Sequence, residues 1–394
     1  MSNLGHRKGT ANVSLGAEFA DKQVEVRQVR HKFLFGCSEF TVPQYLNGEM
    51  SAEVAERAER RYGHLFEIFN AVTLPFYWGR YEPEEGKTNF ENIKKAAEWL
   101  KQRGMTLKGH PLCWHTVCAD WLLQYPNEKI LEIQLNRIKR DVSAFAGLID
   151  IWDVINETVI MPIFTRYDNA ITRLCQQYGR IGLVRQLFET AWATNPNATF
   201  LINDFETSES YDILIEGLLE SGVPIKTIGI QSHMHQGMWS MEKMDEILHR
   251  FSRFKLPIHF TEVNLVSGEL MPPHIVDLND FVPKDWQSTE EGLARQAEQA
   301  AIFYTKLYEN PLLEAITWWN FSDGLWLNAP AGLVDKESNI KPAYTALHKL
   351  IKGDWWTQPQ TLTADGNGNI SVTGTKGDYL AICEGKEVAF TVKD

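Results

Sequence analysis

Two stretches of the chain decide its fold class: residues 148–157 read LIDIWDVINE, and residues 256–264 read LPIHFTEVN. Each is a nearly continuous apolar run that ends in polar residues. A parallel strand that is buried on both faces has this pattern. Six further runs of the same kind occur at 33–40 (FLFGCSEF), 68–76 (IFNAVTLPF), 105–114 (MTLKGHPLCW), 198–206 (ATFLINDFE), 226–235 (KTIGIQSHMH) and 313–321 (LEAITWWNF).

Longer segments with helical periodicity separate these runs, for example at 91–103, 128–146, 180–194, 241–254, 290–309 and 342–352. Proline and glycine fall in the links between them, where strand–helix units need turns. Eight strands with intervening helices favour a closed barrel over an open sheet. The alternative is a doubly wound sheet, but no glycine-rich phosphate loop follows any of the runs. We therefore predict an α/β fold, a (β/α)₈ TIM barrel, over residues 33–352.

The two flanks do not share this alternation. Residues 10–30 alternate in polarity like a β-hairpin with Asp21-Lys22 at its turn, so residues 1–32 are expected to be an N-terminal hairpin flank. Residues 353–394 are expected to be a C-terminal β-strand extension, with three or four short strands between Gly/Asn turns. Because an isolated hairpin is marginally stable in water, we expect the two flanks to pair into one small β-module beside the barrel.

Composition narrows the function. The net charge of −12 argues against a nucleic-acid or anionic-membrane partner, and no apolar run approaches the roughly 18 residues of a membrane span. The N-terminus lacks the apolar core of a signal peptide, so a cytoplasmic protein or a processed secreted or periplasmic form is expected. Five cysteines without a CxxC pair indicate free buried thiols. Thirteen tryptophans exceed what a core of this size needs, and flat rings stack on sugars.

The polar residues that end the runs are the candidates for chemistry, because barrel enzymes build their active sites at the C-terminal ends of the strands. Glu157 ends the fourth run, and Glu262 lies near the end of the seventh. These two carboxylates would face each other across the barrel mouth. Cleavage of an acetal requires one group that protonates the leaving oxygen and one that captures the oxocarbenium-like centre, and a separation of ~5–5.5 Å gives retention of configuration. The pair therefore predicts a retaining glycosidase.

Taken together, these motifs resemble glycoside hydrolase family 10, best known as β-1,4-xylanases. The motifs are WDVINE, FTEVN, GH followed by WH after the third run, IGIQSH, ITWWNFSDGLWL and the closing segment AGLVDKESNIKPAYTALHKLI. The resemblance covers about residues 33–352, and the tail from Trp355 is similar to the β-strand extension of some members. It implies a hydrolase that degrades xylan or a related plant polysaccharide by double displacement, with an oligosaccharide or polysaccharide as partner and no cofactor or metal.

The resemblance also implies roles for single residues. Glu157 matches the acid/base and Glu262 the nucleophile. Asn156 matches a residue that hydrogen-bonds the sugar 2-hydroxyl, and Gln231 and His233 match the pair that orients and tunes the nucleophile.

Four further residues match the walls of the sugar site. His110 and Trp114 would line the site of the cleaved sugar, Trp319 would form its floor, and Trp326 would stack at its rim. Together with the carboxylates they complete the expected site.

One segment departs from the family pattern. Members usually carry Glu-Asn-x-Met-Lys-Trp after the second strand, where these groups bind sugars on the non-reducing side, whereas residues 72–78 read VTLPFYW. The segment is about two residues shorter, Tyr77 stands where lysine is expected, and Trp78 keeps the tryptophan. Tyr77 and Trp78 are therefore included among the substrate-binding candidates. Asn264 also stands where an aspartate is common. A polar site discriminates strongly between hydroxyl patterns, so the change is expected to alter specificity more than cleavage.

Other readings remain open at this point. The change after the second strand is compatible with a glycosidase of the same family that acts on a non-xylan β-glycoside. His233 and His235 have the spacing of metal ligands on one side of a strand, and with His110 and Asp204 they would suit a metal-dependent hydrolase. A non-catalytic sugar-binding barrel would normally lose one of the two carboxylates. The sequence carries no indication of the oligomeric state.

Overall fold

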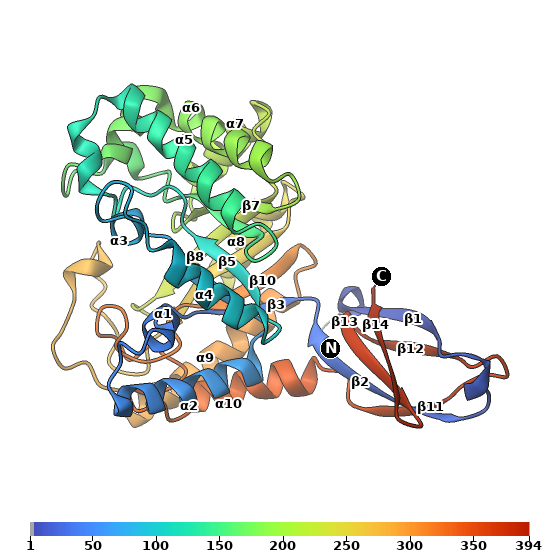
Figure 1. Ribbon diagram of the computed structural model, residues 1–394. Coiled ribbons are helices and arrows are strands. Elements are labelled where there is room, and N and C mark those ends of the chain that lie inside the picture. Colours follow the sequence, from blue (N-terminus) through green and yellow to red (C-terminus); the bar gives the residue numbers. More distant parts are fainter. Residues whose placement is uncertain (1–3, 394) are drawn as a thin grey trace.

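The computed structural model describes residues 4–393, and its centre is a closed barrel of eight parallel strands (Figure 1). The strands follow one another around the barrel in the order β10-β3-β4-β5-β6-β7-β8-β9. Their bounds are β3 Leu34–Ser38, β4 Ala71–Pro75, β5 Thr106–His110, β6 Ile151–Asn156, β7 Thr199–Asp204, β8 Thr227–Met234, β9 Ile258–Leu265 and β10 Leu313–Trp318. The predicted (β/α)₈ barrel is confirmed.

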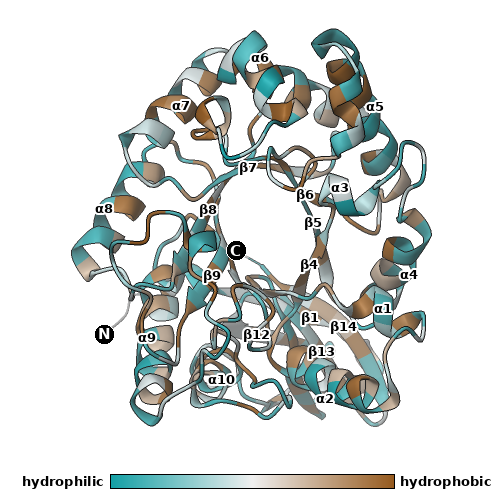
Figure 2. Cartoon of the chain, turned by 90° about the vertical axis from the view of Figure 1, so that its left-hand side faces the viewer, coloured by the Kyte–Doolittle hydropathy of each residue, from teal (hydrophilic) through white to brown (hydrophobic). Residues whose placement is uncertain are grey.

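Helices surround the barrel on its outside, as the view along its axis shows (Figure 2). Several begin at a side chain that caps the first turn: the Oγ1 atom of Thr289 accepts a hydrogen bond from the backbone N of Gly292 at 3.0 Å, and Asn169 caps α6 in the same way. Within residues 4–393, no helix combines the length and the apolar character needed to cross a membrane. The helices are α1 Val42–Leu46, α2 Ala52–Ile68, α3 Trp78–Tyr81, α4 Phe90–Lys101, α5 Asn127–Ala144, α6 Ala170–Thr194, α7 Glu209–Glu220, α8 Met241–Ser252, α9 Glu290–Tyr308 and α10 Pro342–His348.

Large side chains fill the barrel wall and its interior. Trp152 and Trp318 are among the largest fully buried side chains. Trp152 on β6 lies so close to β5 that a Cβ atom added to Gly109 would come within 2.1 Å of its indole ring. A glycine at 109 therefore makes room for the tryptophan, and the dense packing holds the strand ends in fixed positions.

The two flanks form a small β-module beside the barrel (Figure 1). β1 (Lys8–Ser14) pairs with β12 (Asn369–Thr375), whereas β2 (Gln23–His31) pairs with both β11 (Gln360–Thr363) and β13 (Gly377–Cys383), and β13 pairs with β14 (Lys386–Val392). The module expected from the two flanks is thus present. The prediction of a hairpin within residues 10–30 is wrong, because β1 and β2 belong to different sheets and do not pair with each other. Alternation shows which face of a strand is buried, but it does not show which strand lies beside it.

One arginine ties the module to the barrel. The Arg7 guanidinium donates to the carbonyl oxygens of Tyr308, Asn310 and Leu313 at 3.0, 2.7 and 2.9 Å, and it lies over the Phe33 ring at 4.7 Å. Burial lowers the pKa of Arg7 to about 10. These bonds join the segment just before β1 to the end of α9 and the start of β10.

Candidate active site

Glu157 directly follows β6 and adopts a left-handed backbone conformation, with φ of 57°. Such a conformation is costly for a residue with a side chain and is characteristic of functional sites. The backbone N of Glu157 donates to Asn203 O at 2.8 Å, which fixes the turn. Trp114 Nε1 donates to its Oε2 at 2.8 Å, and Gln231 Nε2 donates to its Oε1 at 3.2 Å. The carboxyl is thus held by the loop after β5 and by β8.

The environment of Glu157 favours its protonated form. Burial raises its pKa to about 8, and the charges of Asp204 and Glu262 act in the same direction, whereas the hydrogen bond from Trp114 opposes them. Asp204 is fully buried itself, and burial raises its pKa to about 7. Its Oδ2 accepts a hydrogen bond from the backbone N of Val159 at 3.0 Å, so it also holds the loop after Glu157. A carboxylic acid that keeps its proton near neutral pH is suited to general acid catalysis.

The environment of Glu262 on β9 favours the opposite state. Burial acts to raise its pKa, but a hydrogen bond from His233 and the charges of His110, His233 and Lys108 outweigh burial and hold the pKa below its ordinary value. His233 Nε2 lies 3.0 Å from Glu262 Oε2, and Asn203 Nδ2 donates to Oε1 at 2.9 Å. In the pH range between the two pKa values, Glu262 is therefore ionised while Glu157 is protonated.

A chain of hydrogen bonds orients His233. Its Nδ1 lies 2.6 Å from Asn264 Oδ1, and Asn264 Nδ2 donates to Trp319 O at 2.6 Å. Both ring nitrogens of His233 thus lie within hydrogen-bond distance of side-chain oxygens, which fixes the orientation of the ring beside Glu262. Asn264, which differs from the common aspartate, retains an acceptor oxygen at this position.

Gln231 has a different partner from the one expected. The sequence predicted that it supports Glu262, but its Nε2 donates to Glu157 Oε1 and, at 3.1 Å, to Asn156 Oδ1. The oxygens of Glu262 instead accept a hydrogen bond from Asn203 and face His233. Asn156 in turn donates from Nδ2 to Glu157 Oε1 at 3.3 Å. Gln231 and Asn156 therefore belong to the surroundings of Glu157.

The aromatic candidates mostly gather at the same place. The Tyr77 ring lies 5.6 Å from the rings of both His110 and Trp114, and His110 lies 5.3 Å from Trp319. The Trp326 ring lies 4.6 Å from that of His233. These predicted sugar-site residues thus meet next to the two carboxyl groups.

Trp78 does not join them. It begins α3, its Nε1 donates to Glu82 Oε2 at 3.2 Å, and its buried ring lies 6.0 Å from that of Trp121 with the Arg137 guanidinium 4.7 Å away. The place of a tryptophan in a motif does not reveal which way its side chain points once the strand has ended.

Asn203 was missed by the sequence reasoning. Its Nδ2 donates both to Glu262 Oε1 and, at 2.8 Å, to Asn156 Oδ1, so it links the surroundings of the two carboxyls. Thr261 Oγ1 donates to its Oδ1 at 2.7 Å and fixes the amide. Asn203 stands at the polar end of the run 198–206, and the rule that identified the glutamates would have included it.

A buried ion pair behind His110 was also missed. Lys108 Nζ lies 2.7 Å from Asp153 Oδ2, and His110 Nδ1 lies 2.7 Å from the same oxygen. Asp153 is fully buried and Lys108 is 8 % exposed. The sequence does contain a sign of this pair, because Lys108 and Asp153 are charged residues inside otherwise apolar runs. A buried charge requires a partner, so the two could have been predicted to meet.

The proposed metal ligands do not converge. In the described part of the chain, no three or more His, Cys, Asp and Glu side chains form a group that could hold a metal ion. His110 and His233 are engaged with carboxylates, and the His235 ring lies 5.1 Å from that of Trp326.

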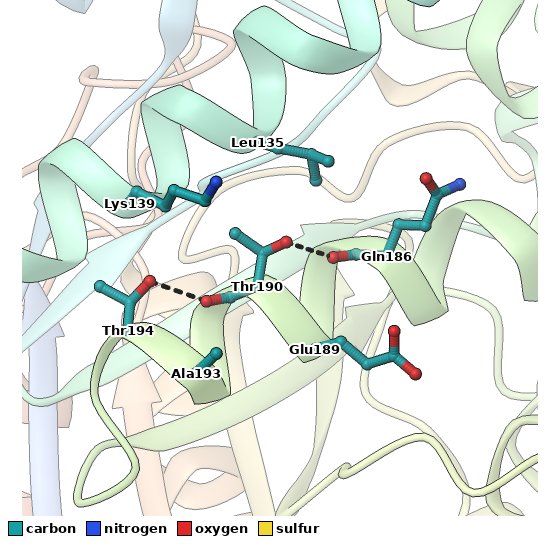
Figure 3. Close-up of a pocket in the computed structure, with 7 residues that line it drawn as sticks. All are labelled: Leu135, Lys139, Gln186, Glu189, Thr190, Ala193 and Thr194. Atoms are coloured by element: carbon teal, nitrogen blue, oxygen red, sulfur yellow. Dashed lines mark hydrogen bonds between the residues drawn. The ribbon is translucent and has the colours of Figure 1, made fainter.

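A depression on the outer surface lies between α5 and α6, away from the strand ends (Figure 3). The hydroxyls of Thr190 and Thr194 in its floor each donate, at 2.7 Å, to a carbonyl of the preceding helical turn. The other residues around it are Leu135, Lys139, Gln186, Glu189 and Ala193. Glu189 is the one acidic residue among these seven, so the depression lacks the carboxyl pair that glycoside cleavage requires.

Two carboxyls with opposed pKa shifts, at the C-terminal mouth of a (β/α)₈ barrel, define a glycoside hydrolase. The model of glycosyl hydrolase family 10 matches residues 46–350, and the chain belongs to that family. It is therefore a retaining glycosidase.

Named relatives agree with this assignment. Endo-1,4-beta-xylanase B of Thermotoga neapolitana is 28% identical over 365 residues, which cover 85% of this chain and 94% of that enzyme. An endo-1,4-beta-xylanase/feruloyl esterase of Xylanibacter ruminicola is 25% identical over 307 residues, covering 69% of this chain but 40% of that longer protein. The crystal structure of xylanase 10B from Thermotoga petrophila in complex with xylobiose shares the fold, with a TM-score of 0.67, 24% identity, and coverage of 82% of this chain and 95% of that one.

Proposed function

We propose that this chain hydrolyses β-1,4-linked xylan within the polymer, with Glu157 as acid/base and Glu262 as nucleophile. The observation that carries the proposal is the opposed ionisation of the two carboxyls at the barrel mouth: burial keeps the proton on Glu157, whereas His233 and other neighbours outweigh burial and ionise Glu262. The substrate follows from the relatives that are named endo-1,4-beta-xylanases.

In the first step, the Glu262 carboxylate attacks the anomeric carbon while Glu157 transfers its proton to the glycosidic oxygen. The bond to the leaving sugar breaks, and a glycosyl ester of Glu262 forms. The N–H groups of Trp114 and Gln231 that point at Glu157 then stabilise its new negative charge.

In the second step, Glu157 accepts a proton from water, and the water oxygen attacks the anomeric carbon and releases Glu262. Esterification removes the charge of Glu262, which is one of the causes of the raised pKa of Glu157. The pKa of Glu157 therefore falls when it has to act as a base. Two inversions at the same carbon give retention.

The surrounding residues position the sugar. Asn156 Nδ2 lies at the mouth beside Glu157, where it is placed to meet the sugar 2-hydroxyl, and the rings around Tyr77 and Trp319 face the same region. We also propose that residues 33–352 form the catalytic unit and that residues 1–32 and 353–394 form a separate module, supported by the module's own core of buried residues such as Val24 and Val372.

The test uses azide as an alternative nucleophile. With an aryl β-xyloside, Glu262→Ala plus azide should yield the α-xylosyl azide, because azide replaces the missing nucleophile. Glu157→Ala plus azide should yield the β-xylosyl azide, because azide then attacks the ester of Glu262. Wild-type turnover in Glu262→Ala, or azides of the opposite configuration, would refute the assignment.

The substrate is tested by resolving the products of the wild-type protein on xylan, arabinoxylan, glucuronoxylan and mixed-linkage glucan. A series of xylo-oligosaccharides early in the reaction supports internal cleavage of xylan. Release of xylose alone, or preference for the glucan, would contradict it.

A further inference from the structure

Four aromatic side chains form a continuous surface at one side of the barrel mouth. The Phe40 ring lies 5.8 Å from Tyr77 and 5.5 Å from Trp319, and Tyr77 lies 5.6 Å from Trp114. Phe40, Tyr77 and Trp114 are half-buried, so part of each ring remains accessible. These four residues are called the aromatic wall below.

Strand order places the wall beside both carboxyls. Glu262 lies on β9 and Glu157 follows β6, while the wall residues follow the strands β10, β3, β4 and β5, which lie between β9 and β6 in the order of the barrel. The charges of Glu262 and Glu157 both contribute to the pKa of Tyr77, which burial holds well above its usual range. A sugar that contacts both glutamates therefore meets the wall on this side, and Tyr77 meets it as a neutral phenol.

Few groups in this arc are available to bind sugar hydroxyls. Residues 74–77 read Leu-Pro-Phe-Tyr, so the turn after β4 carries no acid, amide or amine. Within residues 4–393 the Tyr77 hydroxyl makes no hydrogen bond. His110 has its Nδ1 engaged by Asp153, which leaves its second nitrogen, and the exposed Arg80 guanidinium lies 5.9 Å from the Tyr77 ring.

We propose that the wall holds the sugars on the non-reducing side by stacking on their C–H faces, with little recognition of their hydroxyl groups. The substrate class that follows is xylan whose donor-side sugars carry O-acetyl or O-methyl groups. An aromatic surface can pack against such groups, whereas a site built from hydrogen-bonding partners loses its hydrogen bonds to a hydroxyl that is acetylated or methylated. The identity of the substrate as xylan rests on the proposed function, whereas the stacking of sugars on the wall does not.

The two binding modes differ in measurable size. A site that hydrogen-bonds a substrate hydroxyl rejects an analogue without it by roughly 10⁴–10⁵, whereas apolar pockets discriminate by roughly 10–200-fold. The assay compares kcat/KM for the aryl β-disaccharide that the wild-type protein hydrolyses best with that for its analogue methylated at O-3 of the non-reducing sugar. We expect a ratio within tenfold, and a loss above 100-fold would overturn the proposal.

Variants of Tyr77 test whether the ring or its hydroxyl is used. Tyr77→Phe keeps the ring and should retain at least a third of kcat/KM, whereas Tyr77→Leu keeps the bulk without a flat face and should lose at least tenfold. Trp192→Ala, which removes an aromatic ring that is 44% exposed on α6, is the matched control and should leave activity unchanged. Equal losses in the Phe and Leu variants, or no loss in either, would refute stacking. Thermal melting of each variant separates these losses from unfolding.

Failure of this inference is distinguishable from failure of the proposed function. If the wild-type protein cleaves a β-glucan and no xylan, the proposed substrate is wrong, and the methylation ratio on the aryl cellobioside still decides the binding mode. On xylan itself, acetylated and deacetylated samples should be depolymerised at rates within threefold of each other. Activity confined to the deacetylated polymer would contradict the substrate class.

Discussion

Replacing Glu157 by glutamine is expected to stabilise the protein at alkaline pH. In the unfolded chain this carboxyl loses its proton near its ordinary pKa of 4.5, whereas in the folded protein it keeps the proton until about pH 8. Between these values the unfolded state releases a proton that the folded state retains, so the wild-type protein loses stability as pH rises through this window. Glutamine cannot ionise and avoids the loss.

The magnitude follows from the same two pKa values. At about 1.4 kcal/mol per pKa unit, their difference corresponds to at most about 5 kcal/mol at pH 8, and to almost nothing at pH 4. The side chain of Glu157 is 15% exposed, so solvent screening reduces the gain only modestly. Urea unfolding of both proteins at pH 4, 6 and 8 should show a free-energy difference that grows with pH.

Glu262→Gln is the matched control because its sign is opposite. The pKa of Glu262 is lowered, so its contribution to stability is present above the ordinary pKa and is lost as pH falls through the lower folded value. The variant should therefore be less stable at pH 7, by about 1.5–3 kcal/mol for each charged hydrogen bond that it weakens. A Glu157→Gln variant that is less stable at pH 8, or two variants with the same pH trend, would refute the opposed ionisation.

Three further outcomes are expected. Trp114→Phe removes a hydrogen bond that lowers the pKa of Glu157, so the alkaline limb of kcat/KM should move upward by about one pH unit, and a downward move would count against the acid role. Gly229→Ala would place a Cβ 2.5 Å from Asn203 Oδ1; kcat should fall at least tenfold with an unchanged far-UV circular dichroism spectrum, and wild-type kcat would show that this amide is dispensable. Deleting residues 1–30 removes the partners of the C-terminal strands, which should then be cleaved faster in limited proteolysis; unchanged resistance would show that these strands are stable alone.

The sequence by itself determined the barrel and the two carboxyls at its mouth. Buried parallel strands require long apolar runs, and helices between them require a different period, so local patterns were sufficient to count the strands. Because all strand ends of a barrel meet at one face, the position of Glu157 and Glu262 at the ends of their runs placed them together.

Only the tertiary structure decided which groups contact one another there. Gln231 donates to Glu157 and not to Glu262, Asn203 joins the two, and Trp78 turns away from both. Likewise, the N-terminal strands β1 and β2 do not pair with each other but with strands from the C-terminal end of the chain. The physical reason is the same in each case: periodicity reports which face of an element is buried, while hydrogen-bond partners depend on the stagger between elements that are distant in sequence.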